Sequence, residues 1–206
     1  MTIRAVLWDF GGVITTSPFE SFARYERDNG LPADFIRTLN ATNHHANAWA
    51  KLERNEVGFD EFCELYEAEA LEAGHGIDAR AVMACLAGDV RPQMLAALQT
   101  IKANGLKQGC LTNNFSAMER AGPRSGILDL FDAVIESSKV GVRKPEPAFY
   151  EMACKILEIE PPEAVMLDDL GVNLKPAREM GMTTIKVVDA DAALRELETV
   201  VGFPVG

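Results

Sequence analysis

The amino-acid sequence predicts an α/β fold in which helices cover both faces of a parallel sheet and a helical bundle is inserted after the first strand. Three observations lead to this prediction. The chain opens with a buried strand, a long run of purely helical patterns follows, and strands then alternate with helices to the end. We expect residues 1–14 and 91–206 to form the sheet domain and residues 15–90 to form the inserted helical domain.

The predicted first strand covers residues 5–8, where four apolar residues occur in a row. Such a run is typical of a strand that is buried on both faces of a sheet. Asp9 follows it, and the pair Gly11-Gly12 comes soon after. Burying a lone carboxylate is costly unless a cation or hydrogen-bond donors meet it, and glycines let a ligand approach the backbone closely. The stretch fits an active site at the carboxyl end of a strand, and it equally fits an aspartate that merely begins a turn.

Residues 15–90 carry apolar side chains at helical spacing and no alternating strand pattern. Ser17 is predicted to cap the first helix, with Pro18 in its first position and Glu20 completing a capping box. Asn29-Gly30 is expected to end that helix. Further helical patterns occur near residues 35–39, 49–52, 59–66 and 77–86. The insertion is therefore predicted to be a small helical bundle.

Eight of the fifteen aromatic residues lie in this bundle. They are expected to form its core, and the alternative is that a few of them line a substrate pocket. Substrate specificity is expected to reside in the bundle, where Arg24, Trp49 and Arg54 are candidate contacts. The pair His44-His45 is not expected to bind a metal, because neighbouring histidines on a helix point away from each other.

From residue 91 onward the patterns alternate between helix and strand. Strands are expected at residues 107–111, 133–136, 164–167 and 183–188. Helices are expected at about residues 92–103, 147–158 and 190–201, with a short one ending near Gly181 and a loop at residues 137–144. This alternation predicts a parallel sheet with helices on both faces.

Polar residues stand at or just beyond the ends of four predicted strands. Asp9, Thr112 and the pair Asp168-Asp169 follow their strands directly, and Lys144 follows its strand by one loop. Each has an ordinary explanation as a turn residue, a helix cap or a solvated lysine. The carboxyl ends of parallel strands lie along one edge, however, so we expect these side chains to converge.

The converging set contains carboxylates, a hydroxyl and an ammonium group. Mg²⁺ prefers oxygen ligands, and phosphoryl transfer depends mainly on positioning and charge neutralisation. An aspartate that forms an aspartyl-phosphate is one established route for this chemistry. The pattern therefore favours a Mg²⁺-dependent site for a small phosphorylated substrate.

Three longer stretches carry a family resemblance: residues 111–114 (LTNN), 136–147 (ESSKVGVRKPEP) and 167–178 (LDDLGVNLKPAR). With Asp9, they resemble the four motifs of the haloacid dehalogenase (HAD) superfamily, and the helical insertion resembles its C1 cap. These stretches are similar to those of the phosphatase domain of soluble epoxide hydrolase and of the HAD domain fused to acyl-CoA dehydrogenases. The resemblance implies a Rossmann-like core and a phosphoric monoester hydrolase.

The resemblance also implies the metal site. Asp9 would be the nucleophile and a Mg²⁺ ligand, and Asp169 would be the second carboxylate ligand. Asp168 would support the metal site, and the backbone carbonyl of Gly11 would complete the protein's share of the ligands.

The same resemblance implies how the substrate would be held. Thr112 and the backbone amide of Asn113 would bind the phosphoryl oxygens, and Lys144 would neutralise the nucleophile and the transferred group. Asn173 occupies a position where many relatives carry another acid, so a supporting role or a substrate contact is implied there.

One position departs from the family pattern. HAD phosphatases normally carry an aspartate two residues after the nucleophile, which protonates the leaving group and later activates water, and this chain has Gly11. Positioned acid–base catalysis contributes roughly 10²–10⁴ in rate, so a slow phosphatase is expected unless a cap side chain substitutes. The hydrolysis of acyl and aryl phosphates would be slowed less than that of alkyl phosphates. A catalytically weak phosphate-binding module and a metal-independent 2-haloacid dehalogenase are the alternatives.

Composition limits the other classes of function. The net charge of −11 argues against nucleic acids and anionic membranes as partners, because these select basic patches. Apolar runs stay shorter than the roughly 20 residues that span a bilayer. The four cysteines are widely spaced without a C-x-x-C motif, as expected of reduced thiols in a cytoplasmic protein.

Overall fold

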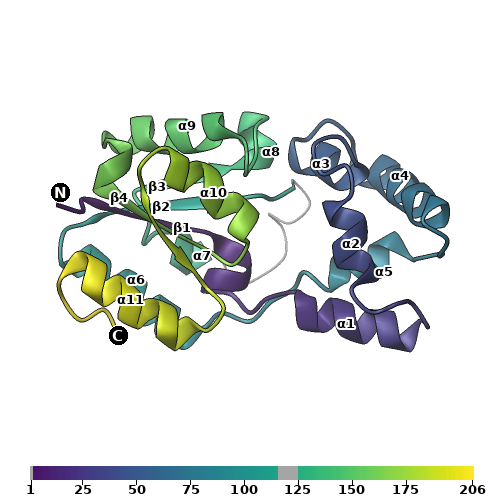
Figure 1. The fold of residues 1–206 in the computed structure, drawn as a ribbon, viewed down its shortest axis with the longest axis horizontal. Coiled ribbons are helices and arrows are strands. Elements are labelled where there is room, and N and C mark those ends of the chain that lie inside the picture. Colours follow the sequence, from purple (N-terminus) through teal and green to yellow (C-terminus); the bar gives the residue numbers. More distant parts are fainter. Residues whose placement is uncertain (1, 116–124) are drawn as a thin grey trace.

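A computed structural model describes residues 2–115 and 125–206. Its centre is a sheet of five parallel strands in the order β3-β2-β1-β4-β5 (Figure 1). The strands are β1 (Ala5–Trp8), β2 (Lys107–Thr112), β3 (Ala133–Glu136), β4 (Ala164–Asp168) and β5 (Thr183–Lys186). The first strand of the chain is thus the middle strand of the sheet. This arrangement confirms the predicted α/β class.

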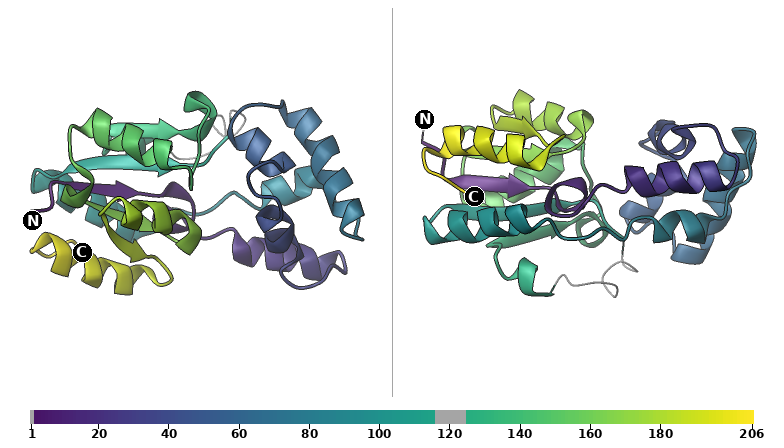
Figure 2. Two further views of the ribbon diagram at one scale, coloured as in Figure 1. Left: turned by 45° about the horizontal axis from the view of Figure 1, so that its top comes forward. Right: turned by 90° about the horizontal axis from the view of Figure 1, so that it is seen from below.

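Helices cover both faces of this sheet, as Figure 2 shows. One face carries the helical turn η1 (Phe10–Ile14) and helices α6 (Pro92–Ala103) and α11 (Ala190–Val201). The opposite face carries α9 (Pro147–Leu157) and α10 (Gly171–Glu179). Three short elements lie in the connections: α7 (Ser125–Leu128), α8 (Ser137–Val140) and η3 (Pro161–Glu163).

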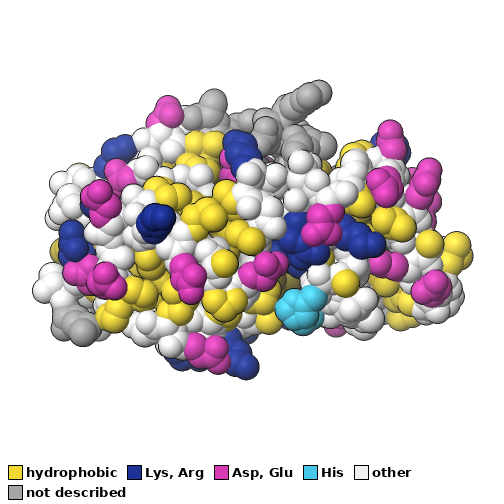
Figure 3. All heavy atoms as spheres, turned by 90° about the horizontal axis from the view of Figure 1, so that it is seen from above, with side chains coloured by type: hydrophobic (Ala, Val, Ile, Leu, Met, Phe, Trp, Pro, Cys, Tyr) yellow, Lys and Arg dark blue, Asp and Glu magenta, His cyan; other side chains and the backbone are white. Residues whose placement is uncertain are grey.

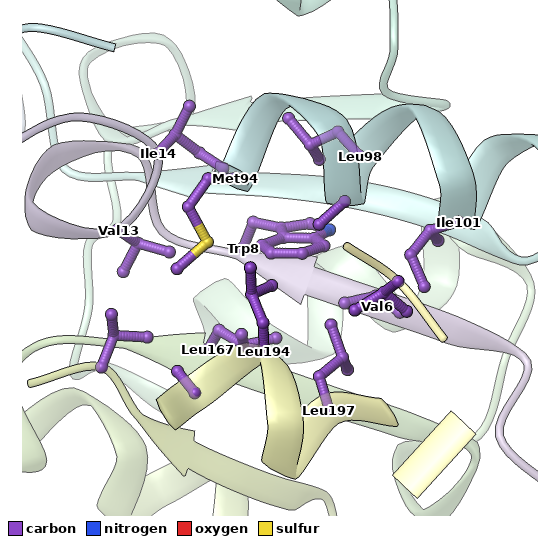
Figure 4. Close-up of a cluster of buried hydrophobic side chains, with 14 of the residues drawn as sticks. Val6, Trp8, Val13, Ile14, Met94, Leu98, Ile101, Leu167, Leu194 and Leu197 are labelled. Atoms are coloured by element: carbon purple, nitrogen blue, oxygen red, sulfur yellow. The ribbon is translucent and has the colours of Figure 1, made fainter. Parts of the chain in front are cut away.

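The side chains of β1 alternate between the two faces and are all buried. Val6 and Trp8 face α6 and α11 (Figure 4), and Leu7 faces α9. The indole nitrogen of Trp8 donates a hydrogen bond of 3.1 Å to the side-chain oxygen of Gln108 on β2. The indole N–H and the Gln108 oxygen are thus hydrogen-bonded to each other inside the core. Strand β1 can therefore be buried on both faces without leaving the indole N–H unpaired.

The inserted helices are α1 (Phe19–Asp28), α2 (Phe35–Ala41), α3 (Ala48–Glu53), α4 (Phe59–Glu72) and α5 (Ala79–Ala84). They pack around a hydrophobic cluster of their own, in which all eight predicted aromatics take part. Phe115, which follows β2, joins this cluster and stacks on Phe59 at a centroid distance of 6.2 Å. The sheet domain therefore reaches into the core of the helical insertion.

Several predicted boundaries need correction. Helix α1 begins at Phe19, because the carbonyl of Pro18 accepts the first helical hydrogen bond and makes Pro18 the cap residue in place of Ser17. Residues 137–140 of the predicted loop form α8, and Gly141 caps its end with a positive φ of 73°. Strand β5 ends at Lys186, opposite the end of β4, two residues earlier than predicted.

The premise about the histidine pair is also wrong. Helix α2 ends at Ala41, so His44 and His45 lie in the turn before α3 and not on a helix. Their rings approach to a centroid distance of 3.9 Å instead of pointing apart. All four cysteines are free thiols.

We expect Gly109→Ala to lower the free energy of unfolding by about 1–3 kcal/mol, because overpacking a tight core forces side chains from their preferred positions. A Cβ on Gly109 in β2 would lie 2.9 Å from Leu7 and 3.0 Å from Leu157. Urea unfolding would measure the change. The matched control is Gly76→Ala, where the nearest atom would be 4.0 Å away and a change within about 0.5 kcal/mol is expected. Equal effects at both positions would contradict the packing argument.

Candidate active site

Three carboxylates meet at the carboxyl edge of the sheet. Asp9 follows β1, Asp168 ends β4, and Asp169 comes next. Strands β1 and β4 are neighbours with Trp8 opposite Leu167, so Asp9 and Asp168 stand side by side. One oxygen from each of the three carboxylates lies within 4.8 Å of the others. The site thus forms where the strand order reverses around β1, as open α/β sheets favour.

Asp9 is buried and held at both carboxylate oxygens. Its Oδ1 accepts a hydrogen bond of 2.6 Å from the backbone N–H of Phe10, and its Oδ2 lies 2.8 Å from Nζ of Lys144. Its own backbone N–H donates to the carbonyl of Leu167 at 2.9 Å. A carboxylate fixed in this way keeps a single orientation, so it would lose little rotational freedom in a reaction.

Lys144 is only 1% exposed and is shared between two carboxylates. Its Nζ lies 2.8 Å from Asp9 Oδ2 and 2.7 Å from Asp168 Oδ2. The side chain of Asn113 also grips the main chain of Lys144: its Oδ1 accepts from the Lys144 N–H at 2.9 Å, and its Nδ2 donates to the Lys144 carbonyl at 3.0 Å. Lys144 is therefore positioned at both its backbone and its charged end.

Asp168 has both oxygens occupied by the protein itself. Besides Lys144, it accepts hydrogen bonds from the backbone N–H of Leu170 at 2.8 Å and from the amide of Asn173 at 3.0 and 3.1 Å. The carbonyl of Asn173 in turn accepts the hydroxyl of Tyr150 at 2.6 Å. Asn173 thus lies behind Asp168 and holds its carboxylate by hydrogen bonds.

The two glycines after Asp9 have different structural roles. Gly12 adopts a positive φ of 76°, and a Cβ there would overlap the carboxylate of Asp169. Any side chain at residue 12 would displace that carboxylate. Gly11 has φ −70° and ψ 133°, which any residue can adopt, and a Cβ there would meet nothing within 4 Å. The backbone therefore does not require glycine at residue 11.

Thr112 is the last residue of β2 and is nearly buried, one position beyond the level of Asp9 in the neighbouring strand. The loop after it is tied to α8 through Asn114, whose Nδ2 donates to Glu136 at 2.7 Å and whose Oδ1 accepts from the Ser138 hydroxyl at 2.8 Å. The side-chain roles of Asn113 and Asn114 could not be read from the sequence, since asparagines at strand ends usually indicate turns.

The electrostatics show an excess of negative charge. Burial raises the pKa of Asp9 well above its usual value, Lys144 opposes this, and Asp168 and Asp169 raise it further. Burial and the Asp168 charge raise the pKa of Asp169 to about 6. Burial alone would lower the pKa of Lys144, but Asp168 and Asp9 outweigh it, so its pKa is raised. One ammonium only partly compensates three carboxylates, and the hard oxygen donors fit Mg²⁺.

The helical insertion brings further charges to this edge. Arg37 of α2 lies over the Phe19 ring at 4.9 Å from its centroid, and its charge helps to lower the pKa of Asp169. Of the predicted contacts, Arg24 is exposed on α1, whereas Trp49 and Arg54 lie at the junction with the sheet domain. Arg37 was not predicted, because the sequence does not reveal which side of α2 faces the site.

Residues 3–181 match the family described as haloacid dehalogenase-like hydrolase. This match covers most of the chain. The chain belongs to the haloacid dehalogenase-like hydrolases. The resemblance seen in the sequence motifs is thereby confirmed.

Curated relatives agree with this assignment. The HAD chain is 33% identical over 98% of its length to acyl-CoA dehydrogenase family member 10 of Mus musculus and to bifunctional epoxide hydrolase 2 of Sus scrofa. It spans only 19% and 39% of those two proteins. Glyceraldehyde 3-phosphate phosphatase of Methanocaldococcus jannaschii is 28% identical over 90% of this chain and 85% of its own length.

Solved structures share the fold. A predicted HAD-like family hydrolase from Porphyromonas gingivalis superimposes with a TM-score of 0.70 at 18% identity, covering 96% of this chain and 98% of that one. A HAD family enzyme from Bacteroides thetaiotaomicron, in complex with magnesium and inorganic phosphate, gives a TM-score of 0.61 at 18% identity, covering 89% of this chain and 93% of that one. Within the described part of this HAD chain, no helix is both long and apolar enough to cross a membrane.

We expect Asp169→Asn to raise the unfolding temperature in EDTA at pH 7.5 by about 2–4 °C, because it removes about 1 kcal/mol of the cost of burying this charge beside Asp168. With a folded pKa of about 6, Asp169 binds its proton more tightly than in the unfolded chain, where an aspartate titrates near 4. The folded state therefore holds more protons between about pH 4 and pH 6, and the stability contributed by this group falls as the pH rises through that window.

The same variant should lose most of the stabilisation that Mg²⁺ gives the wild type, since a ligand that binds only the folded state raises its stability. Scanning fluorimetry with and without Mg²⁺ would measure both effects. Asp129→Asn, which changes an exposed carboxylate, is the control and should respond to Mg²⁺ like the wild type. An undiminished Mg²⁺ response in Asp169→Asn would contradict its assignment as a ligand.

Proposed function

We propose that this HAD hydrolase is a Mg²⁺-dependent phosphatase of a small phosphorylated metabolite, with Asp9 as the nucleophile that forms an aspartyl-phosphate. The observation that carries the proposal is the arrangement of Asp9: one oxygen is oriented by the Phe10 amide, and the other lies beside the Lys144 ammonium. Glyceraldehyde 3-phosphate phosphatase of Methanocaldococcus jannaschii, which this chain matches over most of both lengths, supports the same class of reaction.

The residues that would hold Mg²⁺ are Asp9, Asp169 and the backbone carbonyl of Gly11. Asp168 would support this metal site by orienting Lys144, whose ammonium donates to its Oδ2 at 2.7 Å. When bound, Mg²⁺ would neutralise charge on the phosphoryl oxygens and on the carboxylates. Because Gly12 has no side chain, the Asp169 carboxylate can occupy the space beside it.

In the first step, a carboxylate oxygen of Asp9 attacks phosphorus as the bond to the leaving oxygen breaks. Lys144 balances the charge of the nucleophile and of the transferred group, and Thr112 with the Asn113 amide would hold the phosphoryl oxygens. In the second step, water attacks the phosphorus of the aspartyl-phosphate, and inorganic phosphate leaves with Asp9 restored. Since Gly11 offers no proton, the leaving oxygen would take its proton from solvent.

This lack of a positioned acid defines the preferred substrates. Aryl and acyl phosphates have leaving groups that depart without protonation, whereas alkyl phosphates need it. We therefore propose a phosphatase that is slow on alkyl esters. Gly11 equally favours a second candidate, a catalytically weak module that binds a phosphorylated ligand. A metal-independent dehalogenase is less well supported, since Asp169 adds a carboxylate for which that chemistry has no use.

We expect Asp9→Asn to reduce turnover of p-nitrophenyl phosphate in Mg²⁺ by at least about 10³-fold, because the amide cannot act as the nucleophile. A phosphate-release assay would measure the loss, and circular dichroism would check the fold. Asp129→Asn is the control and should keep wild-type turnover. Unchanged turnover in Asp9→Asn would exclude the aspartyl-phosphate route, and a wild type that binds phosphate without turnover would support the binding module.

We expect Gly11→Asp to increase hydrolysis of alkyl phosphates, by up to about 10²-fold, and to change aryl phosphates much less, because only poor leaving groups need the proton. The backbone at residue 11 and the open space around it accommodate a side chain. The matched control is Gly11→Asn, which has the same shape without the acid. Steady-state kinetics on both ester classes would test this, and an equal gain with the two variants would contradict it.

A further inference from the structure

Arg143 is the residue before Lys144, and its side chain enters the helical insertion. Its Nε lies 2.5 Å from Oε2 of Glu53, the last residue of α3, and its Nη1 donates to the carbonyl of His44 at 2.7 Å. Both charged side chains are about one-tenth exposed. The sheet domain therefore supplies a cation whose partners in this junction belong to the insertion.

Glu53 is in turn anchored in the core of the insertion. Its Oε1 accepts a hydrogen bond of 2.9 Å from the indole of Trp49, whose ring packs on Phe62 and Tyr66 of α4. Burial raises the pKa of Glu53, and the charge of Arg143 opposes this rise. Separating the insertion from the sheet domain would break this ion pair, so the attraction between Arg143 and Glu53 favours the arrangement in which the two parts are in contact.

A second ion pair crosses the same junction in the opposite sense. Arg54 of the insertion lies 3.6 Å from Glu146 of the sheet domain, and it also donates to the carbonyl of His45 at 3.0 Å. The consecutive residues 53 and 54 thus face residues 143 and 146, which flank Lys144. Figure 3 shows basic, acidic and histidine side chains gathered on the insertion side of this junction.

The junction is mechanically connected to the reactive lysine. Arg143 points to the insertion, and the next residue, Lys144, points to Asp9 and Asp168. The side chain of Asn113 fixes the main chain of Lys144 through two hydrogen bonds. Because Arg143 and Lys144 are consecutive residues, a displacement of Arg143 would move the main chain of Lys144.

We propose that Arg143 is a positioning residue that, through Glu53, latches the helical insertion closed over the site and so holds Lys144 in its working orientation. This assignment deepens the proposed phosphatase function and rests on it for its catalytic meaning. The latch itself concerns the contact between the two domains. It can therefore be measured without turnover.

Loss of the latch lowers the fraction of molecules with a closed insertion, and the apparent affinity for a ligand of the closed state falls in proportion. Arg143→Met keeps the aliphatic stem without the charge, and Glu53→Gln keeps the acceptor for Trp49. Arg143→Lys can pair with Glu53 but cannot reach the His44 carbonyl with the same fork, so partial rescue is expected.

The first experiment compares backbone hydrogen exchange over residues 42–54 in the full-length protein. Arg143→Met and Glu53→Gln should each speed exchange about tenfold, and the double variant should be no faster than either single one, because both remove the same interaction. The control is Arg80→Gln, which removes an exposed ion pair to Asp60 inside the insertion and should leave exchange over these residues unchanged. Additive effects, or wild-type exchange in the single variants, would overturn the latch.

The second experiment uses inorganic phosphate with Mg²⁺ as the probe and follows thermal stabilisation. The phosphate concentration that gives half of the maximal rise in unfolding temperature should increase about tenfold in Arg143→Met and Glu53→Gln. It should increase less in Arg143→Lys and stay unchanged in Arg80→Gln. Faster exchange with unchanged phosphate affinity would refute the link to Lys144. Absence of turnover in the wild type would count against the proposed phosphatase, while both readouts of the latch would remain decisive.

Discussion

Lys144 places its ammonium group between Asp9 and Asp168, where water scarcely reaches it. A buried charge persists only where opposite charges and hydrogen bonds replace its hydration. This one interaction joins the end of β1, the end of β4 and the loop that leads into α9. The parallel sheet brings these ends together, and the charge pairing gives them a single arrangement.

The site also stores unfavourable electrostatic energy. Asp169 adds a third carboxylate to a cluster with one ammonium, and burial raises the pKa values of Asp9 and Asp169. Such crowding is a cost to the folded state that a structural role would not explain, and sites of this kind commonly exchange stability for function. Glycine at residue 12 serves the same arrangement, since a side chain there would displace the Asp169 carboxylate.

The helical insertion is connected to the reactive edge by side chains that leave the loops of the site. Phe115, three residues after Thr112, packs into the core of the insertion, and Arg143, one residue before Lys144, pairs with Glu53. The loop that follows Thr112 and the loop that carries Lys144 therefore each reach into the insertion. A movement of the insertion would therefore displace both loops and the site residues next to them.

The sequence by itself determined the class of fold and the identity of the chemical groups. The apolar run of β1 could be read because burial on both faces excludes polar residues, and Asp9, Thr112, Lys144 and Asp168-Asp169 stood out because polar residues follow such runs. Local signals also located most helices, with errors of one or two residues where the capping residue depends on a single hydrogen bond, as at Pro18.

Only the tertiary structure decided how these groups divide their work. The side chain of Asn113 grips Lys144, Asn173 lies behind Asp168, and Arg143 pairs with Glu53, which is 90 residues away in sequence. None of these partners follows from local propensity, because hydrogen bonds and ion pairs between distant residues depend on strand register and on which side of a helix faces its neighbour. The sequence specifies that such groups exist, and packing selects which of them meet.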